Sequence, residues 1–411
     1  MPKATHAESL MPVEQALASI DNAIKPINET EQITLSAAMD RVVAEDIVSP
    51  FAVPSFDNSA MDGYAIRCAD LARSKICKLI GTSYAGNAFD GKLGAGECVR
   101  IMTGAELPEG ADAVVMQENV LVQNSDVQIL VDIQVGEAVR RAGCDIEYKQ
   151  TVIAAGTKIS PIHIGLIASL GLNTINVFRR VKVAVISTGD ELLAQGEPAQ
   201  KGKIFDTNRP MLLAMLQRLG AETRDFGIIA DNLHEIREAF LQANKWADCV
   251  VTSGGVSVGD ADYVKQVLGE LGKVELWKLA LKPGKPLAFG SLSESMFFGL
   301  PGNPVSAAVT FDIVAAPAIQ KLQGGRASET PIMSAIAAVP FKKAPGRCDY
   351  QRAYCSVNED GDLQVVPMGR QSSAVLSSFS TANAYAVLEQ ARGDVKQGER
   401  VNVQLFASPL V

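Results

Sequence analysis

The chain has 411 residues, of which 47% are apolar and 20% are charged, and its formal net charge is −8. This length exceeds one ordinary hydrophobic core, and the composition is that of a soluble globular protein with two to four domains. An acidic chain is poorly suited to broad nucleic-acid binding, which requires a basic face.

The N-terminal region shows no apolar core followed by a cleavage site, so we expect no signal peptide. No stretch approaches the roughly 18 consecutive apolar residues of a transmembrane helix, and we therefore expect a cytoplasmic protein without membrane association. Residues 12–25 have helical apolar spacing, and a continuation through residues 36–41 fits the same pattern.

The pattern changes after Pro50, where short β-type runs alternate with glycine-marked turns. This predicts an inserted all-β domain over residues 51–144. Residues 145–180 are mixed, and a helix at about 161–170 begins with Ser160 as N-cap and Pro161 as its first residue. We expect residues 1–50 and 145–180 to pack together as a helical domain that carries the β insertion.

Strands alternate with helices over residues 181–328, which predicts a doubly wound α/β domain. Its mostly parallel sheet should be covered by helices on both faces. Within this domain we expect a hairpin at residues 287–301 and a long helix at residues 304–322. Residues 329–411 return to β-type runs and predict a small C-terminal β domain, so the fold class is multidomain with α/β and all-β parts.

Four polar segments that contain glycine follow the predicted strands of the α/β domain. They cover residues 187–192, 253–265, 278–286 and 299–306. Ligands of open parallel sheets bind at the carboxyl ends of the strands. We therefore predict that the four segments line one site for a phosphate-bearing ligand and magnesium.

The first two segments combine acids with glycines. Asp190 and Glu191 follow a glycine turn and suit Mg²⁺ or a ribose hydroxyl, and an ordinary Asx turn is the alternative. In the second segment, SGGVSVGDADY, glycines allow backbone N–H groups to cradle oxyanions before a helix; a plain flexible loop is the alternative. The segment lacks the terminal Gly-Lys-Ser/Thr of a Walker A loop.

The third and fourth segments offer positive charge and a helix start. Lys278, Lys282 and Lys285 lie close together in a proline-stiffened stretch and suit phosphate or molybdate-like anions, with a solvated surface as the alternative. Asn303 and Pro304 suit the N-cap and first position of an anion-receptive helix, with a purely structural cap as the alternative.

Three further polar runs lie in or beside the predicted β insertion, at residues 56–64, 100–105 and 140–145. Each fits a turn with surface charges equally well, or part of a cleft formed with another subunit. The seven scattered cysteines contain no CxxC, and the three histidines are not spaced as metal ligands. This pattern argues against a disulfide framework, a zinc site and a Ser-His-Asp triad.

The motifs FDNSAMDGYA, RIMTGA, ISTGDEL, DTNR, SGGVSVGDADYVK, KPGKP and GLPGNPVS occur in this order along the chain. Together they resemble the MoeA family of molybdopterin molybdenumtransferases, which is related to the C-terminal part of gephyrin. The resemblance covers essentially the whole chain. It implies four domains, the third of them similar to MogA, and an elongated homodimer. The active cleft would join the third domain of one subunit to the second domain of the other.

The resemblance also implies the reaction. Molybdate would be inserted into adenylylated molybdopterin with Mg²⁺ and release of AMP, to form molybdenum cofactor. A molybdopterin adenylyltransferase would act upstream, and molybdoenzymes or a carrier downstream. The rival hypotheses are a non-catalytic cofactor carrier or scaffold of gephyrin type and a nucleotide-dependent transferase acting on another pterin or sugar phosphate. An adenylyltransferase role is less favoured.

Residues are assigned from the matched motifs and from the segments above. The predicted catalytic residues are Asp62, Glu191, Lys278 and Lys282, and the predicted metal ligands are Glu191 and Asp231. Substrate binding is predicted for Thr103, Arg140, Asp145, Ser253, Gly254, Gly255, Ser257, Asp262, Pro301 and Pro304. Arg347 matches a motif of the fourth domain. Cys144 stands where the family usually has an acid, which puts the role of that neighbouring acid in doubt.

Overall fold

The computed structural model describes residues 10–255, 263–325 and 330–406. The chain forms two compact units. The unit that we call the α/β unit comprises residues 1–31, 40–44 and 177–411, and the insertion unit comprises residues 32–39 and 45–176. Each is described by itself below.

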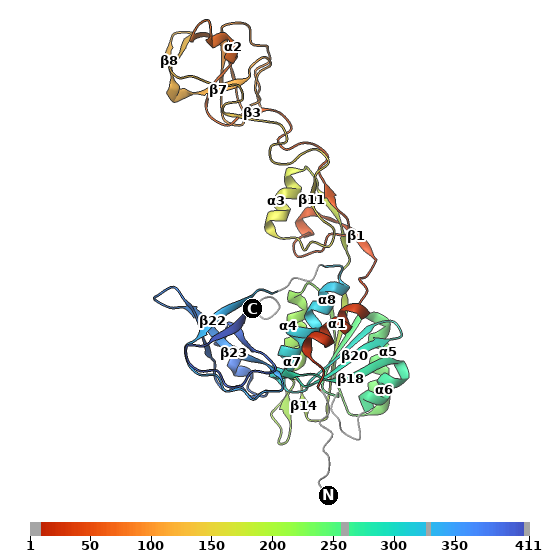
Figure 1. Ribbon diagram of the computed structural model, residues 1–411. Helices are drawn as coiled ribbons and strands as arrows, with labels where there is room; N and C mark the ends of the chain where they lie inside the picture. The colour runs from red at the N-terminus through yellow and green to blue at the C-terminus, as the bar shows by residue number, and fades with distance from the viewer. Residues whose placement is uncertain (1–9, 256–262, 326–329, 407–411) are drawn as a thin grey trace. The chain divides into compact units, whose positions relative to one another are not determined.

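A six-stranded sheet forms the centre of the α/β unit (Figure 1). Five of the six strands run in the same direction, and only β20 runs antiparallel to its two neighbours. With β21 it forms the hairpin predicted from the sequence. In spatial order the strands are β16 (Glu222–Ile229), β13 (Lys182–Thr188), β17 (Cys249–Ser253), β21 (Met296–Leu300), β20 (Pro286–Leu292) and β18 (Gly272–Lys278).

Alternate residues of the central strands enter two separate cores, one on each face of the sheet. Val183 and Val185 of β13 face one core, whereas Ala184 and Ile186 face the other. Figure 1 shows the helices on these two faces. The first core is covered by α1 (Val13–Ala23), α4 (Asn208–Arg218), α7 (Pro304–Thr310) and α8 (Ala316–Leu322), and the second by α5 (Leu233–Trp246) and α6 (Tyr263–Leu271).

Helix α1 departs from the predicted domain arrangement. Its buried residues Val13, Ala16 and Ile20 belong to the core of the α/β unit, where we expected residues 1–50 to pack with residues 145–180. Residues 36–41 do not continue the helix, because strand β1 (Thr30–Thr34) intervenes and only a short 3₁₀ turn, Leu35–Ala37, follows. Sequence spacing indicates an apolar face but does not indicate which core buries that face.

The long helix predicted at residues 304–322 is present. A π-helical segment, Phe311–Ala315, separates α7 from α8, and Pro317, which has no backbone N–H, lies just beyond it. This helix of 19 residues is long and apolar enough to cross a membrane, but 78% of its most apolar part is buried inside the protein. The helix is therefore part of the core of the α/β unit.

The C-terminal β region of the α/β unit forms a closed barrel, because β23 pairs with both β24 and β25. A two-residue strand, β19 (Leu281–Lys282), extends it by parallel pairing that aligns Lys282 with Asp349. The barrel strands are β22 (Ile332–Ala337), β23 (Cys348–Val357), β24 (Leu363–Pro367), β25 (Ala384–Leu388) and β26 (Arg400–Leu405).

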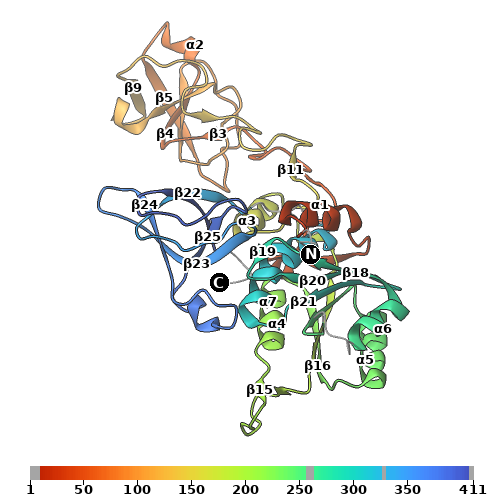
Figure 2. The same cartoon turned by 60° about the horizontal axis from the view of Figure 1, so that its bottom comes forward.

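The insertion unit contains a second six-stranded sheet (Figure 2). Its order is β7 (Ala113–Met116), β4 (Gly63–Ile66), β6 (Glu97–Ile101), β5 (Ile76–Ser83), β9 (Asp126–Ile129) and β8 (Val120–Gln123), with α2 at Cys68–Leu71. The remaining elements are β2 (Ile47–Val48), β3 (Asn58–Ser59), β10 (Val139–Arg140), β11 (Thr151–Ile153), α3 (Pro161–Ser169) and β12 (Thr174–Phe178). Ser160 caps α3 as predicted, since its Oγ accepts the His163 N–H.

Candidate active site

One cleft of about 1260 Å³ in the α/β unit is lined by residues from all four predicted segments. It opens where β13, β17 and β21 end, which is the expected place for a ligand of a parallel sheet. Two parts of its wall were not assigned to the site from the sequence. One is β15 (Ile204–Phe205), which pairs with β14 (Leu192–Leu193) and extends from the unit in Figure 2. The other is residues 371–374 of the C-terminal barrel.

The turn after β17 brings backbone close to the cleft. Ser253, Gly254 and Gly255 all line it, and both glycines have positive φ, at 92° and 65°. A Cβ at Gly254 would lie 2.9 Å from the Thr188 carbonyl oxygen, and one at Gly255 would crowd Val264. Only glycine therefore fits these positions, and the turn exposes main chain rather than side chains to a ligand.

Asn208 connects two of the cleft segments and was not singled out from the sequence. Its buried amide Nδ2 donates to Ser253 Oγ at 2.6 Å and to the Gly302 carbonyl at 2.7 Å. The preceding Asp206 is 2% exposed and accepts from Arg209 Nε at 2.9 Å. The DTNR motif thus fixes the position of the segments on either side of the cleft.

Two residues that line the cleft carry buried hydroxyls without a partner in the described structure. Ser187 Oγ and Thr188 Oγ1, at the end of β13, accept and donate no hydrogen bond there, although both residues line the cleft. A buried hydroxyl without a partner is costly, and a ligand oxygen would satisfy it. These groups leave unused hydrogen-bonding capacity at two residues of the cleft wall.

The predicted metal ligands lie at the ends of neighbouring strands. Glu191 follows β13 and lines the cleft, and its carboxylate occupies the space that a Cβ at Gly189 would need. Asp231 follows β16, and its N–H donates to Asp190 Oδ1 at 3.0 Å. Burial raises the pKa of the Asp231 carboxyl, and the neighbouring Asp190 and Glu191 carboxylates raise it further. Three acids thus share one region, where a cation would relieve their mutual repulsion.

The region is not a closed metal cage. Over the described parts of the chain, no three Asp, Glu, His or Cys side chains are grouped so that they could hold a metal ion. Mg²⁺ does not require such a cage, since it binds through one or two carboxylates together with waters and ligand phosphates.

Basic side chains line the opposite wall of the cleft. Lys282, Lys285 and Arg347 all belong to it. Lys282 Nζ forms an ion pair with Asp349 Oδ2 at 2.9 Å, so this lysine is held in place by the barrel. Lys278, predicted to be catalytic, ends β18 and is not among the residues that line the cleft.

The start of α7 also faces the cleft, with Pro301 and Pro304 on its wall. Asn303 occupies the predicted N-cap position, but its side chain makes no capping hydrogen bond. Instead the first-turn N–H of Val305 donates to the carbonyl of Ser373 at 3.1 Å. One donor of this helix start is therefore already used by the barrel, which reduces its capacity to bind an anion.

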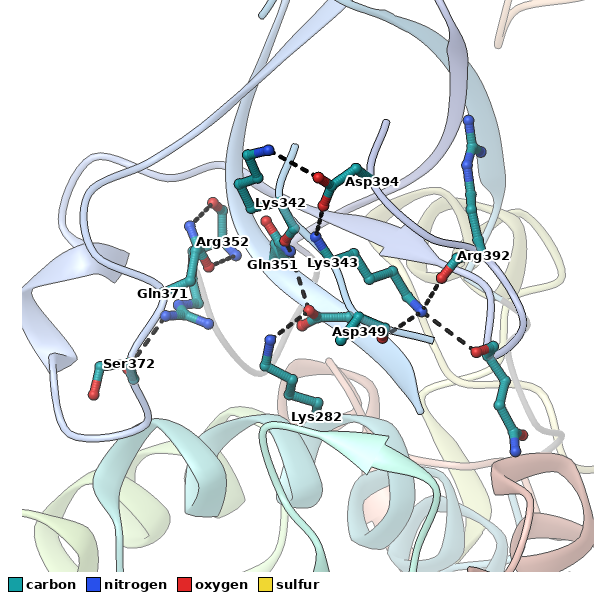
Figure 3. Close-up of polar contacts among 12 residues, drawn as sticks. Lys282, Lys342, Lys343, Asp349, Gln351, Arg352, Gln371, Ser372, Arg392 and Asp394 are labelled. Atoms are coloured by element: carbon teal, nitrogen blue, oxygen red, sulfur yellow. Dashed lines mark hydrogen bonds and ion pairs between the residues drawn. The ribbon is translucent and has the colours of Figure 1, made fainter. Parts of the chain in front are cut away.

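A buried arginine supports the barrel loop that closes the cleft (Figure 3). Arg352 is fully buried, and its Nη2 donates to the carbonyls of Arg370 and Ser372, both at 3.3 Å. Gln371 also accepts from the Arg352 N–H at 3.0 Å. These hydrogen bonds hold residues 370–372 of the loop in place.

The insertion unit carries its own polar cluster at Asp62. Asp62 Oδ1 accepts from the Thr103 N–H at 2.7 Å and from Thr103 Oγ1 at 2.8 Å. The backbone N–H of Thr103, followed by its hydroxyl, lowers the pKa of the Asp62 carboxyl. The structure therefore brings these two predicted residues together and holds Asp62 in its ionised form.

Arg140 and Asp145 lie on either side of a turn in the same unit, and both are exposed. Asp57 fixes this turn; it belongs to the polar run at residues 56–64 but was not assigned a role from the sequence. Its carboxylate accepts from Arg141 Nη1 at 2.5 Å and from the Ala142 N–H at 2.8 Å. The Ala142 N–H makes the largest contribution to the lowered pKa of Asp57.

Three family descriptions match the chain in sequence order. The MoeA N-terminal region (domain I and II) matches residues 11–171, a probable molybdopterin binding domain matches residues 184–321, and the MoeA C-terminal region (domain IV) matches residues 334–406. The molybdopterin molybdenumtransferase of Haemophilus influenzae is 45% identical over 97% of this chain and 99% of its own length. The chain belongs to the MoeA family.

Other members of the family agree over the same extent. The molybdopterin molybdenumtransferase of Bacillus subtilis is 32% identical over 96% of this chain and 94% of its own length. Gephyrin of Dictyostelium discoideum is 32% identical over 97% of this chain and 62% of its own length. A crystal structure of the molybdopterin biosynthesis MoeA protein of Pyrococcus horikoshii superimposes with a TM-score of 0.84 at 28% identity, covering 97% of this chain and all of that one.

The MoeA fold accounts for the parts described above: an α/β domain, a β-rich N-terminal region and a C-terminal β-barrel. Two of the predicted substrate-binding residues, Ser257 and Asp262, lie outside the described residues.

Proposed function

We propose that the cleft of the α/β unit binds adenylylated molybdopterin and molybdate and that the bound substrates react there with release of AMP. As a MoeA-family member the chain is a molybdopterin molybdenumtransferase that acts in molybdenum cofactor biosynthesis. Our proposal concerns where and how it does so. The observation that carries it is the lining of one cleft, which combines the glycine turn at Gly254 and Gly255 with three basic residues, Lys282, Lys285 and Arg347. Ser187 and Thr188, whose buried hydroxyls have no partner, belong to the same lining.

The two walls of the cleft suit different parts of the reaction. The glycine turn at Gly254 and Gly255 and the hydroxyls at the end of β13 would bind phosphate oxygens through short, directional hydrogen bonds. Lysine and arginine on the other wall would neutralise the charge of molybdate and of the pyrophosphate linkage. Cleavage of such a linkage depends on positioning and charge neutralisation, so no histidine base is needed.

Magnesium is part of this proposal. Glu191, with Asp231 or Asp190, would hold the ion, since these carboxylates meet at the strand ends and burial and mutual repulsion raise the pKa of Asp231. The ion would supply positive charge to the phosphate oxygens. The protein groups orient the ligand, and Thr188 and Ser187 hold its oxygens on the same side as the carboxylates.

The site is proposed to be shared between two copies of the chain. Asp62, Thr103, Arg140 and Asp145 would come from the insertion unit of the partner in a homodimer. The support is the fixed geometry of Asp62, which two hydrogen bonds from Thr103 hold on an exposed surface of the insertion unit. The proposal also includes an upstream adenylyltransferase, downstream molybdoenzymes or a carrier, and a cytoplasmic location. The MogA-like third domain would span residues 181–328, with the inserted domain at 51–144 and the C-terminal domain at 329–411. Helix α1 packs into the core of the α/β unit, so it does not join residues 145–180 in a separate domain.

The decisive experiment supplies the purified protein with adenylylated molybdopterin, molybdate and Mg²⁺ and measures AMP by chromatography. We expect AMP release that depends on molybdate and on Mg²⁺ and that matches the molybdenum cofactor formed. Tight ligand binding without AMP would instead indicate a carrier or scaffold. AMP release that does not depend on molybdate would contradict the assigned use of the basic wall.

A further inference from the structure

A short strand pairing connects the cleft to the C-terminal barrel. β19 and β23 run in parallel, and their register places Lys282 beside Asp349. The Lys282 ammonium lies 2.9 Å from Asp349 Oδ2 (Figure 3). A residue of the cleft wall is therefore held by a carboxylate from another domain of the same unit, and that carboxylate is not itself among the lining residues.

The Asp349 carboxylate is fixed more rigidly than a surface acid. Its side chain is only 3% exposed, and Oδ2 also accepts from Gln351 Nε2 at 3.1 Å. The same Gln351 nitrogen donates to the Lys342 carbonyl at 2.8 Å. Because Gln351 is itself buried, the acceptor for Lys282 has one defined position.

Lys282 keeps part of its donor capacity for a ligand. An ammonium has three N–H donors, and Asp349 accepts one of them. The Lys282 side chain is 37% exposed and lines the cleft, so its other donors face the space where an anion would bind. A flexible lysine loses considerable rotamer entropy when a ligand orders it, and the ion pair has already removed much of that freedom.

The negative charge of Asp349 also interacts with a second ammonium, that of the buried Lys343. Lys343 is 6% exposed and donates to the carbonyls of Ala344, Gln390 and Arg392 at 3.3, 3.4 and 2.7 Å. Burial lowers the pKa of Lys343, Asp349 raises it, and Lys282 lowers it again, so the three charges interact. Without Asp349 the two lysines would repel each other across a partly dry region.

We propose that Asp349 is a positioning residue of the transferase reaction. Asp349 fixes the Lys282 ammonium before the oxyanion binds, so that binding costs little further rotamer entropy of this lysine. This inference rests on the proposed function of the cleft. It differs from a purely structural role for the ion pair, in which Asp349 would stabilise the barrel but leave anion binding unchanged.

Substitution of Asp349 by Asn tests the proposal. The amide keeps the size of the side chain but removes its charge, so Lys282 loses its fixed position. We expect the apparent KM for molybdate to rise at least about tenfold with a smaller change in kcat. The Lys282→Met variant should show a similar rise. The double variant should be no worse than Lys282→Met alone, because both substitutions remove the same interaction.

The insertion unit offers a control. Lys75 and Asp132 form another lysine–aspartate pair at 2.8 Å, on an exposed surface, and neither residue lines the cleft. Asp132→Asn should leave the KM for molybdate unchanged. Equal KM values for Asp349→Asn and wild type, or additive losses in the double variant, would overturn the positioning role.

Two further measurements keep the test decisive. If Asp349→Asn does not fold, Asp349→Glu retains the charge but displaces it by one methylene; an unchanged KM there would overturn the proposal, and a raised KM would support it. If the wild type releases no AMP, the proposed function fails, and calorimetric titration with molybdate alone still compares the variants. Equal molybdate affinity in wild type and Asp349→Asn would then refute the positioning role by itself.

Discussion

The cleft of the α/β unit and the Asp62 cluster of the insertion unit hold their polar groups in different ways. In the cleft, buried side chains such as Asn208 and Arg352 fix loops from several segments. In the insertion unit, one exposed residue, Thr103, holds Asp62 through its backbone and side chain. The cleft therefore depends on buried contacts among several segments, whereas the Asp62 cluster depends on one exposed contact between two segments.

This difference predicts how each region responds to substitution. Changes beneath the cleft should affect both stability and ligand binding, because the supporting residues are buried and satisfy polar groups. Changes at Asp62 should affect turnover with little effect on stability, because the group is exposed. The following predictions test the contrast, beginning with the largest expected effect.

Glu191→Gln and Asp62→Asn should each lower AMP release by at least about 100-fold, since each removes a charge from the proposed site. Mixing the two inactive proteins under conditions that allow subunit exchange should restore about a quarter of wild-type activity. Half of the random dimers would be mixed, and each would contain one fully intact site and one doubly substituted site. Activity is measured as AMP release before and after exchange.

The same mixture distinguishes shared from separate sites. If Glu191 and Asp62 act within one subunit, no combination of the two variants would regain activity. Mixing either variant with itself provides the control for exchange conditions. A full loss in Glu191→Gln with normal activity in Asp62→Asn would assign catalysis to the cleft alone.

Asn208→Ala should combine a stability loss with weaker molybdate binding. The substitution leaves Ser253 Oγ and the Gly302 carbonyl without their shared donor, which should lower the free energy of unfolding by about 1–3 kcal/mol. Urea denaturation gives the first quantity and calorimetric titration the second.

Asn244→Ala is the matched control for that prediction. Asn244 is 3% exposed and bonds Ser293, Glu294 and Ser295, none of which lines the cleft. It should lose similar stability but keep its affinity for molybdate. Equal affinity losses in both variants would mean that the effect on binding is only a general loosening of the fold.

The sequence predicted those parts of the molecule that depend on local pattern. The helix spacing, the hairpin at residues 287–301 and the capped helix at Ser160 are all present. The four cleft segments also meet, because parallel strands place their carboxyl ends on one edge of the sheet. Local pattern and a topological rule were sufficient for these features.

What escaped prediction depends on contacts between distant segments. Asp349 lies 67 positions from Lys282, and nothing in its own neighbourhood indicates a role in the cleft. The Val305 N–H donates to the Ser373 carbonyl of the barrel, and the Asn303 side chain makes no capping hydrogen bond. Helix α1 joins the α/β core for the same reason: amphipathic spacing does not specify the partner surface.

Thr103→Val should produce a smaller change in turnover than Asp62→Asn. It removes one hydrogen bond to the Asp62 carboxylate but retains the backbone N–H that makes the largest contribution to its lowered pKa. We expect kcat/KM to fall about 5- to 10-fold, which corresponds to about 1 kcal/mol for one solvent-exposed hydrogen bond. The acid side of the pH–rate profile should shift to higher pH, because the pKa of Asp62 rises when a donor is lost.

Thermal unfolding of the same variant tests the contrast with the cleft. Its midpoint should match that of wild type, since Asp62 and Thr103 are both exposed. A marked loss of stability would show that the turn is a structural element of the insertion unit and would remove the distinction drawn between the two regions.

The smallest expected effect on turnover concerns Asp312, within the π-helical segment of the long core helix. Burial raises the pKa of the Asp312 carboxyl from 3.8 to about 7. The native state therefore keeps its proton over a range in which the unfolded chain loses it, and stability should fall as the pH rises from about 4 to about 7. Asp312→Asn has no carboxyl group at this position. Its free energy of unfolding should therefore rise relative to that of wild type between about pH 4 and about pH 7, and the difference should stay constant at higher pH.

Guanidinium denaturation at intervals between pH 4 and pH 9 measures this difference, which we expect to reach at least about 1 kcal/mol at pH 8. Asp360→Asn, a change at an exposed turn, should give a constant difference from wild type over the same range. Parallel curves for Asp312→Asn and wild type would contradict the assignment. Turnover at pH 8 should remain near the wild-type value, since Asp312 does not line the cleft and its charge acts on the core beneath it.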